Sequence, residues 1–403
     1  GRFRIVSEEI IEKIRKLIEN IISGKIFYEI FIHPDPDSLV TASFIIRLLG
    51  SANKEIGVVS YEENIEPSDK SLLIGFGRPK KGFKGFLIGR DKTFSVREDK
   101  YILIPYKYSL TKIFYEASKE IYRFPREFRE FALASHLFNL SPSEMIHRVE
   151  DNELSANLDA FGSDVAKIIY GLKLMSFYDE SYLENTLFYT IDPYIPGVSG
   201  NIDKIRMILE SLGSGRGREY LQKVSGAINN LARSNILSLG NKPYFDLSPF
   251  IDPYEIIRAL DIFANKDIAS TALYIASGIS GIAYLATKFR ERLDSLIGVI
   301  NKIIGEKTYE VISHKINNLK ISEFYIKSSS CDYDLLYEVF VIFKDLGVIN
   351  DPLVIRCGEK YLYPWNKNIT FSPESIESIR GMFLVFDSIK SIGEIEKYVE
   401  SRD

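Results

Sequence analysis

The sequence predicts an α/β protein with an N-terminal doubly wound, mostly parallel sheet, a helical connector and a smaller C-terminal α+β domain. The first observation behind this prediction is an aromatic-rich apolar run at residues 26–32, which leads through an acidic tip into an apolar helical pattern at residues 39–49. The second is that short apolar runs then alternate with helical patterns through the first half of the chain. The third is the mixed pattern beyond residue 300.

The individual elements are predicted from apolar periodicity and from the glycines and capping residues that punctuate it. An amphipathic helix opens at Ser7 and ends at Gly24, and the helix after the acidic tip stops at Gly50. Buried strands are then expected at 56–60, 71–76, 85–88 and 101–104, with helices around 110–121 and 128–138. Helical patterns follow at 142–182, 202–212, 219–236 and 253–289, and the last part carries apolar runs at 339–343, 353–356 and 382–386 before a closing helix at 392–399.

The 403-residue chain is long for one domain, so two or three are expected. The stretch from Ile191 to Gly197 is dense in proline and glycine and is typical of a connector. We therefore predict three parts: an α/β domain at 1–190, a connector with a helical region at 191–300, and an α+β domain at 301–403.

Composition narrows the possible functions. The net charge of −4 provides no global basic field, so any nucleic-acid binding must come from a local patch. Two cysteines, Cys331 and Cys357, are too few for a disulfide framework or a zinc motif and fit a reducing cytosol. No signal peptide is recognisable, and we expect a cytoplasmic protein.

One segment, residues 268–287, carries no charge and has about the length of a membrane span. Because it is rich in Ser, Thr, Ala and Gly rather than Leu or Phe, it favours a buried helix pair broken near Gly278 or Gly281. We predict no membrane association.

The acidic tip is the first candidate for chemistry. His33, Asp35 and Asp37 stand at the end of a predicted strand, where open α/β sheets present their ligands, and Pro34 and Pro36 restrict the backbone. Two carboxylates and an imidazole could hold a divalent metal. The alternative is that the aspartates only cap the following helix together with a serine. Spacing alone leaves both readings open.

Two glycine-rich loops carry clustered basic residues and are candidates for contacts with a nucleic-acid backbone. A phenylalanine in the first of them could stack on a base. The alternative is a solvated surface loop in the first case and an ordinary turn between helices in the second. The candidate nucleic-acid-binding residues are Arg78, Lys80, Lys81 and Lys84 in the first loop and Arg216 and Arg218 in the second.

The acidic tip and the connector together resemble a known superfamily. His33-Pro-Asp-Pro-Asp-Ser resembles the first motif of the DHH phosphoesterase superfamily, whose RecJ-like members carry His-x-Asp-x-Asp-Gly there. Asp192-Pro-Tyr-Ile-Pro-Gly is similar to the connector of archaeal RecJ-like proteins, and residues 252–278 are similar to the helices that precede their DHH-associated domain. The resemblance implies a DHH domain first, a DHH-associated domain last and nucleic acid between them. Active members cleave phosphodiesters with two metal ions, usually manganese, sometimes magnesium.

The chain departs from the superfamily's metal-binding pattern at four positions. Gly75 stands where the second motif has its aspartate, and Gly89-Arg90 stands where Asp-His-His begins. Asn139 replaces the next expected aspartate. A guanidinium at position 90 would repel metal ions and could pair with Asp35 or Asp37. The resemblance therefore predicts only a remnant of the first motif, with no catalytic residues, no metal site and no cofactor.

The superfamily contains a group with this loss, the Cdc-forty-five replication factors and their archaeal relatives. The chain resembles an archaeal member, which implies a chromosome-associated, non-catalytic protein that joins GINS to the MCM helicase and contacts single-stranded DNA. One alternative is an active single-strand exonuclease or small-nucleotide phosphodiesterase with displaced ligands, for which His136, His147 and Asp91 are the candidates. Neither histidine has a carboxylate at metal-ligand spacing on its own helical face. Another is a regulatory protein that binds a nucleotide without cleaving it.

Overall fold

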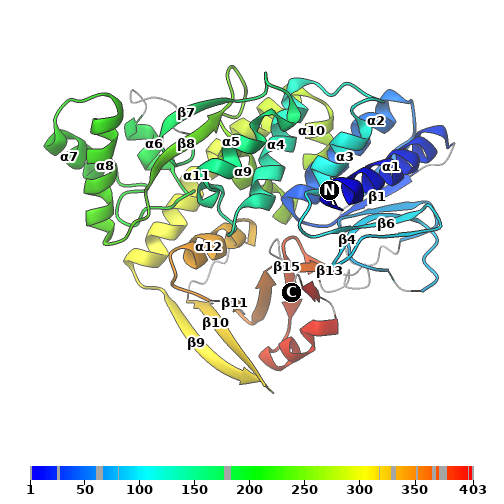
Figure 1. The fold of residues 1–403 in the computed structure, drawn as a ribbon. Coiled ribbons are helices and arrows are strands. Elements are labelled where there is room, and N and C mark those ends of the chain that lie inside the picture. Colours follow the sequence, from blue (N-terminus) through cyan, green and yellow to red (C-terminus); the bar gives the residue numbers. More distant parts are fainter. Residues whose placement is uncertain are drawn as a thin grey trace.

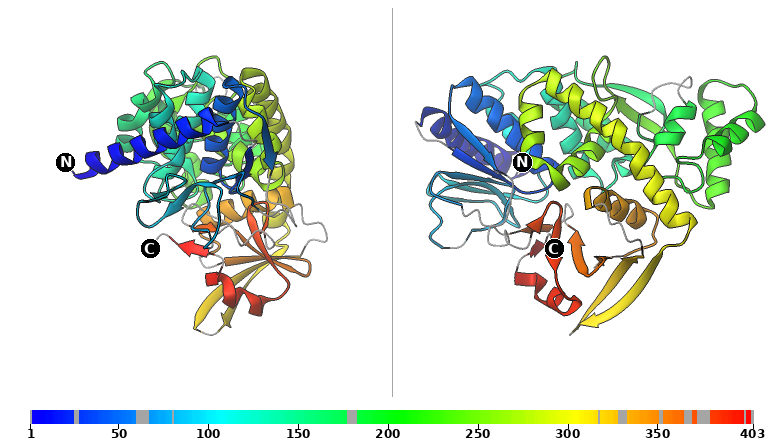
Figure 2. Two further views of the ribbon diagram at one scale, coloured as in Figure 1. Left: turned by 90° about the vertical axis from the view of Figure 1, so that its right-hand side faces the viewer. Right: turned by 180° about the vertical axis from the view of Figure 1, so that it is seen from behind.

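The computed structural model shows two sheet-containing parts joined by a body of helices (Figure 1). The N-terminal sheet and its helices lie beside the helical body, and the C-terminal part lies below both, with the long helix α11 (Ile279–Gly305) crossing the back of the molecule towards it (Figure 2). The structure describes residues 2–24, 28–59, 67–79, 81–176, 183–316, 318–327, 333–350, 353–364, 369–371, 379–397 and 399–401.

The N-terminal sheet has six strands in the order β2-β1-β3-β4-β6-β5. All neighbours pair in parallel except the short β5, which is antiparallel to β6. The order reverses direction between β1 and β3, which is the place where doubly wound sheets bind ligands at the carboxyl ends of their strands. The strands are β1 (Tyr28–Ile32), β2 (Ile56–Val59), β3 (Ser71–Ile74), β4 (Phe86–Asp91), β5 (Ser95–Arg97) and β6 (Tyr101–Pro105).

Side-chain alternation divides the residues of this sheet between two apolar cores. Ile30, Leu72 and Ile88 belong to the main core that includes the flanking helices, whereas Phe31 and Leu73 point to a smaller cluster on the other face. The main-core face is near-continuously apolar, as expected of buried parallel strands. The helices that pack with it are α1 (Arg2–Ser23), α2 (Pro36–Ser51), α3 (Leu110–Ser118) and α4 (Arg126–Leu140).

Helix α9 (Pro253–Lys266) lies at the centre of the molecule and is buried over nearly its whole length. It contacts α2, α4, α10 (Ile268–Ala276), α11 and α12 (Tyr333–Asp345), so one helix joins the N-terminal, helical and C-terminal parts. The helical body also contains η1 (Ile146–Arg148), α5 (Asp151–Asn157) and η2 (Leu158–Phe161).

A separate small module packs around its own apolar core at the end of the molecule opposite the N-terminal sheet (Figure 1). It contains an antiparallel ribbon of two strands and three helices. These elements are β7 (Lys167–Leu172), β8 (Leu239–Tyr244), α6 (Leu183–Tyr189), α7 (Ile202–Leu212) and α8 (Gly217–Ala232).

The C-terminal part is a mixed sheet with α12 packed on it. The strand order is β14-β15-β12-β11-β10-β9, and only β10 and β11 are parallel. β9 and β10 form a long hairpin at the lower edge of the molecule (Figure 1). The elements are β9 (Tyr309–Ile316), β10 (Leu319–Ile326), β11 (Leu353–Cys357), β12 (Lys360–Pro364), β13 (Ile369–Phe371), β14 (Ile379–Arg380), β15 (Phe383–Phe386), η5 (Ile389–Lys397) and β16 (Val399–Ser401).

The predicted fold class is confirmed, with differences in detail. The apolar run 339–343 lies inside α12, and the closing segment is a 3₁₀ helix followed by a strand rather than an α-helix. The β9–β10 hairpin was not predicted, because its outer strand carries few buried side chains. The three domain boundaries remain a prediction; β7 and β8, on either side of residue 190, pair with each other.

The charge-free segment 268–287 forms the predicted helix pair, α10 and α11, which breaks at Ser277 and Gly278. Among the described residues, every helix is too short or too polar to cross a membrane. The expectation for the cysteines is wrong, because Cys357 is disulfide-bonded; Cys331 lies outside the described residues.

Candidate functional site

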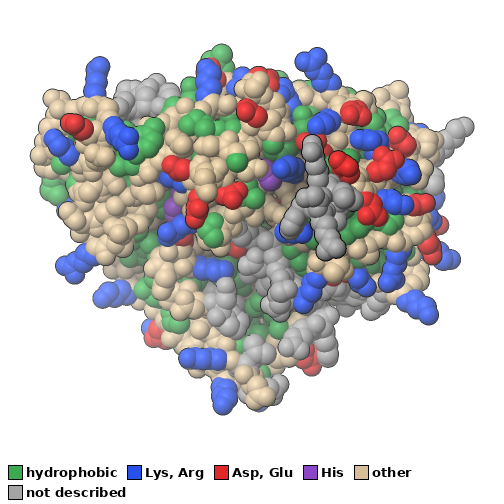
Figure 3. All heavy atoms as spheres, in the orientation of Figure 1, with side chains coloured by type: hydrophobic (Ala, Val, Ile, Leu, Met, Phe, Trp, Pro, Cys, Tyr) green, Lys and Arg blue, Asp and Glu red, His purple; other side chains and the backbone are tan. Residues whose placement is uncertain are grey.

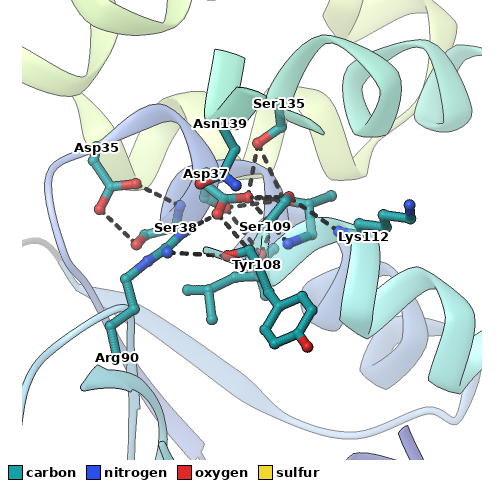
Figure 4. A network of polar contacts seen from close by, with 12 residues as sticks. Asp35, Asp37, Ser38, Arg90, Tyr108, Ser109, Lys112, Ser135 and Asn139 are labelled. Atoms are coloured by element: carbon teal, nitrogen blue, oxygen red, sulfur yellow. Dashed lines mark hydrogen bonds and ion pairs between the residues drawn. The ribbon is translucent and has the colours of Figure 1, made fainter. Parts of the chain in front are cut away.

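The acidic tip lies at the carboxyl end of β1, and its two aspartates have different surroundings (Figure 4). Asp35 is the N-cap of α2, and its Oδ1 accepts a hydrogen bond from the Ser38 backbone amide at 2.9 Å. Its Oδ2 contacts His33 Nδ1 at 2.5 Å and accepts from Ser38 Oγ at 2.6 Å. Burial would raise the pKa of Asp35, but the hydrogen bond and charge of His33, with the charge of Arg90 and the Ser38 hydroxyl, lower it overall.

Asp37 is buried and caps a different helix, α3. Its carboxylate accepts from the backbone amides of Leu110 at 2.8 Å and Thr111 at 3.0 Å, which are the first two residues of α3. The N-terminal end of a helix favours a negative charge at this place. Three hydroxyl groups also donate to Asp37: Ser109 at 3.0 Å, Thr111 at 2.7 Å and Ser135 at 2.8 Å.

Arg90 completes this arrangement from the end of β4. Its guanidinium is buried, its Nη2 pairs with Asp37 Oδ2, and its Nη1 donates to the Tyr108 carbonyl oxygen at 3.2 Å. Figure 4 shows the Arg90 side chain reaching from β4 to the carboxylate from below, opposite Ser135. The expected pairing of Arg90 with a first-motif aspartate is therefore present, and its partner is Asp37.

Six donors thus converge on the two carboxylate oxygens of Asp37, four on Oδ1 and two on Oδ2. A carboxylate offers about four lone-pair positions. Nothing remains on Asp37 for a metal ion, and a fixed cation already touches it. In this arrangement the residues present do not fit a pair of divalent ions, and among the described residues no three His, Cys, Asp or Glu side chains gather as metal ligands.

The backbone at the two glycine positions of the superfamily's second and third motifs is closely packed. Gly75 has a φ of +83°, and a Cβ atom there would overlap Ser38 Oγ and lie 2.7 Å from Ser38 Cβ. A Cβ atom at Gly89 would overlap the carbonyl oxygen of Phe76 and lie 2.9 Å from Leu87 Cδ1. Neither position accepts an aspartate side chain without a shift of its neighbours.

Asn139 lies at the same site, near the end of α4, and its Nδ2 donates to the Lys107 carbonyl oxygen at 3.2 Å. His136, one turn earlier, contacts Asn157 Oδ1 through Nε2 at 2.8 Å, and its Nδ1 is buried without a hydrogen-bond partner. Burial, together with the nearby charge of Lys112, lowers the pKa of His136 to about 4. His136 is therefore a neutral core residue at pH 7.

The second candidate histidine, His147 in η1, lies in another buried network. Its Nδ1 is 2.5 Å from Asp192 Oδ1 and its Nε2 is 3.6 Å from Asp345 Oδ2. The spacing argument that denied it a carboxylate partner is wrong, because both carboxylates come from distant parts of the sequence. His314, to which the sequence assigned no role, pairs with Glu323 at 2.5 Å.

The candidate basic residues do not form one patch. The loop after β3 and the loop before α8 lie at opposite ends of the molecule (Figure 1), and Lys and Arg side chains are spread around the outline of this face rather than gathered (Figure 3). Arg78 pairs with Asp91 at 2.5 Å, which also removes Asp91 as a displaced metal ligand. Lys81, Lys84 and Arg216 are exposed, and Lys80 lies outside the described residues.

Two aromatic contacts change the interpretation of these loops. Phe83 is half-buried and stacks on Tyr101 with ring centroids 5.7 Å apart, so it is not free to stack on a base as expected. Arg218 is exposed, and its guanidinium carbon lies 4.3 Å from the ring centroid of Tyr170.

A buried charge cluster around Arg258 was missed by the sequence reasoning. Arg258 in α9 is fully buried and contacts Asp192 Oδ2 at 3.6 Å, Asp261 Oδ2 at 3.0 Å and Glu338 Oε2 at 3.3 Å. It also donates to the Glu144 carbonyl oxygen at 2.6 Å. These partners belong to the connector, α9, α12 and the segment before η1, so the cluster joins three parts of the chain. Only the charged positions within the otherwise apolar pattern of 253–289 could have indicated it.

The comparisons with known proteins give a fold. No protein-family model and no curated protein matches the sequence. The structure is similar to the crystal structure of CDC45 from Entamoeba histolytica, with a TM-score of 0.53 and 10% identity over 93% of this chain and 89% of that one. It is also similar to RecJ from Thermus thermophilus in complex with Mn²⁺, with a TM-score of 0.43 and 11% identity over 96% of this chain and 53% of that one. The chain therefore has a fold of the CDC45 and RecJ type, a mixed α/β architecture with a parallel-rich sheet and a further sheet-containing part.

Proposed function

We propose that this protein is a non-catalytic replication factor of the Cdc-forty-five type, which links GINS to the MCM helicase and contacts single-stranded DNA. We place it on the chromosome in the cytoplasm of an archaeal cell and assign it no metal cofactor. The fold shared with CDC45 supports the class of protein. The observation that carries the loss of catalysis is the Asp37 carboxylate, whose oxygens are all engaged by protein donors.

The chemistry of phosphodiester cleavage in this superfamily explains why that observation matters. Two divalent ions must be held by carboxylates that neutralise their four positive charges. Here one of the two remaining carboxylates is neutralised by Arg90, and the other caps α2 and accepts from His33 and Ser38. A scaffold that keeps the fold and needs no metal is consistent with this internal pairing.

Direct DNA contact is supported only by local features. Lys81 and Lys84 are exposed in the loop between β3 and β4, whose first residues lie beside the acidic tip. A contact through such lysines is electrostatic, so it weakens as salt rises and does not depend on base sequence.

Reconstitution tests the partner assignment. The chain is mixed with purified GINS and MCM from the same source organism and followed by size-exclusion chromatography with light scattering. The proposal predicts a stable complex with GINS and a ternary complex with MCM. Separate elution of all three proteins at low and at moderate salt would contradict it.

The DNA contact is tested separately by gel shift with a labelled single-stranded oligonucleotide at two salt concentrations. We expect binding at low salt that weakens at high salt, and a further loss in the variant Lys81→Glu/Lys84→Glu. Lys167→Glu/Lys204→Glu, on the distant small module, is the matched control and leaves binding unchanged. Absence of binding at both salt concentrations, with and without GINS, removes DNA from the proposal.

A further inference from the structure

The hairpin of α10 and α11 presents an uncharged face to the solvent on the back of the molecule (Figure 2). Residues 268–287 contain no charged side chain, yet four large apolar or aromatic residues of this segment are well exposed. Solvent-facing helix surfaces ordinarily carry charged residues. Absence of charge together with exposed tyrosines is the composition found at the centre of protein interfaces. The exposed fractions are 49% for Leu273, 39% for Tyr274, 54% for Ile279 and 45% for Tyr284.

This face is hollowed on both sides of a ridge formed by Leu273 and Tyr274. A cavity of about 470 Å³ lies between α2 and α10 and is lined by Arg47, Tyr122 and Leu273, among others. A second cavity of about 400 Å³ lies among α9, α10, α11 and the start of α12, with Tyr274 in its lining. Hollows of this size accept apolar side chains of a binding partner.

The rim of the second cavity is positively charged at its outer edge. Lys266 and Arg292 both contact the same Oδ2 atom of Asp334 at 3.0 Å. The Asp334 side chain is 18% exposed, whereas those of Lys266 and Arg292 are 62% and 34% exposed, so the cations lie further out than the carboxylate. Lys288 adds another cation, 43% exposed. A partner meets the positive groups first, and charge complementarity favours an acidic one.

We propose that the α10–α11 hairpin is a docking surface for a segment of another protein that carries large apolar side chains flanked by Asp or Glu. The apolar side chains enter the two hollows beside Leu273 and Tyr274, and the carboxylates pair with Lys266 and Lys288. The inference rests on the proposed function only in that a scaffold needs protein partners. Leucine and isoleucine at the centre of the face suit protein side chains better than a phosphate backbone.

Selection from a random peptide library displayed on phage tests this surface without a known partner. The full-length chain is immobilised, and selected peptides are synthesised for affinity measurement by fluorescence anisotropy. We expect enrichment of sequences with paired large apolar residues and neighbouring Asp or Glu. Leu273→Ser/Tyr284→Ser should weaken their binding by about tenfold or more. Met207→Ser/Leu231→Ser, on exposed apolar residues of α7 and α8, is the matched control and keeps full affinity.

A charge-reversed variant, Lys266→Glu/Lys288→Glu, tests the acidic preference. It should lose the acidic peptides, and its own selection should yield basic ones. No enriched sequences, or peptides that bind the Leu273→Ser/Tyr284→Ser variant unchanged, overturn the proposal. A concentration-dependent dimer in sedimentation that the same variant abolishes also overturns it, because the face then binds a second copy. Because the selection uses neither GINS nor MCM, its failure is distinct from failure of the proposed function.

Discussion

Ser38 occupies the space that a side chain at position 75 would need. A Cβ atom on Gly75 would overlap Ser38 Oγ, and that hydroxyl donates to Asp35 at 2.6 Å. The superfamily that the first motif resembles has glycine where Ser38 stands and aspartate where Gly75 stands. The two differences therefore compensate each other in space: the hydroxyl fills the volume left by the missing carboxylate.

Introducing the aspartate alone should therefore be harmful. We expect Gly75→Asp to lower the free energy of unfolding by about 3 kcal/mol or more, since it combines a steric overlap with a positive φ. Gly82→Asp is the matched control, because Gly82 also has a positive φ, +103°, but nothing within 4 Å of its Cβ position; we expect a loss of about 1 kcal/mol. Ser38→Gly/Gly75→Asp should recover at least about 1 kcal/mol of the difference. Urea unfolding measures all three, and equal losses for Gly75→Asp and Gly82→Asp would show that Ser38 imposes no constraint.

The Arg90–Asp37 pair should contribute far more to stability than the Arg78–Asp91 pair near it. Arg90 is buried, so Arg90→Ala leaves an uncompensated carboxylate and should cost about 3 kcal/mol. Arg78 is 47% exposed, and Arg78→Ala should cost less than about 1 kcal/mol. Thermal and urea unfolding compare the variants, and similar costs would contradict the buried pairing described for Asp37.

Two residues of α4 should give opposite pH dependences. The pKa of His136 falls from 6.5 to about 4, so the unfolded state binds its proton more tightly and stability rises with pH between about 4 and 6.5. Burial raises the pKa of Glu130 from 4.5 to about 7, so the folded state holds that proton and stability falls with rising pH between about 4.5 and 7.

Substitution at either residue should expose the contribution of the other. Glu130→Gln should make the free energy of unfolding rise more steeply between pH 4.5 and 6.5 than in the wild type, and His136→Asn should make it rise less or fall. Urea titrations at a series of pH values measure these slopes. Parallel pH profiles for both variants and the wild type would show that neither group titrates as described.

Two aspartates beside Arg258 should respond differently to replacement by asparagine. Burial raises the pKa of Asp261 well above its usual range, despite the charge of Arg258, so Asp261 is neutral at pH 7. For Asp192, burial is outweighed by the hydrogen bond and charge of His147 and by Arg258, and its pKa is lowered. Asp261→Asn should change stability by less than about 1 kcal/mol, whereas Asp192→Asn should cost about 3 kcal/mol. The reverse order in urea unfolding would contradict this assignment of charges.

The strand, acidic tip and helix of the candidate site could be predicted from the sequence because their signals are local. Proline, a capping residue and a periodic apolar pattern follow one another between residues 26 and 49. The attraction between Arg90 and an aspartate of the tip also followed, since parallel strands end at one edge of the sheet. The choice of Asp37 over Asp35 did not follow, because it depends on the N-terminus of α3 and the hydroxyl of Ser135.

Long-range packing accounts for what sequence reasoning missed. The overlap of Ser38 with a side chain at position 75 depends on the distance between two strand ends, which no periodicity reports. The partners of Arg258 come from four separate segments, and a single arginine within an apolar helix gives no sign of them. Phe83 resembled an exposed stacking residue because its contact with Tyr101 lies across the sheet.

The central claim is that the Asp37 site no longer supports metal-dependent cleavage. The most direct measurement is cleavage of a 5′-labelled single-stranded oligonucleotide in manganese, with Asp35→Ala/Asp37→Ala prepared in parallel. We predict no products above buffer for either protein at any manganese concentration. Cleavage by the wild type that is lost in the double variant would contradict the account and make the protein a nuclease.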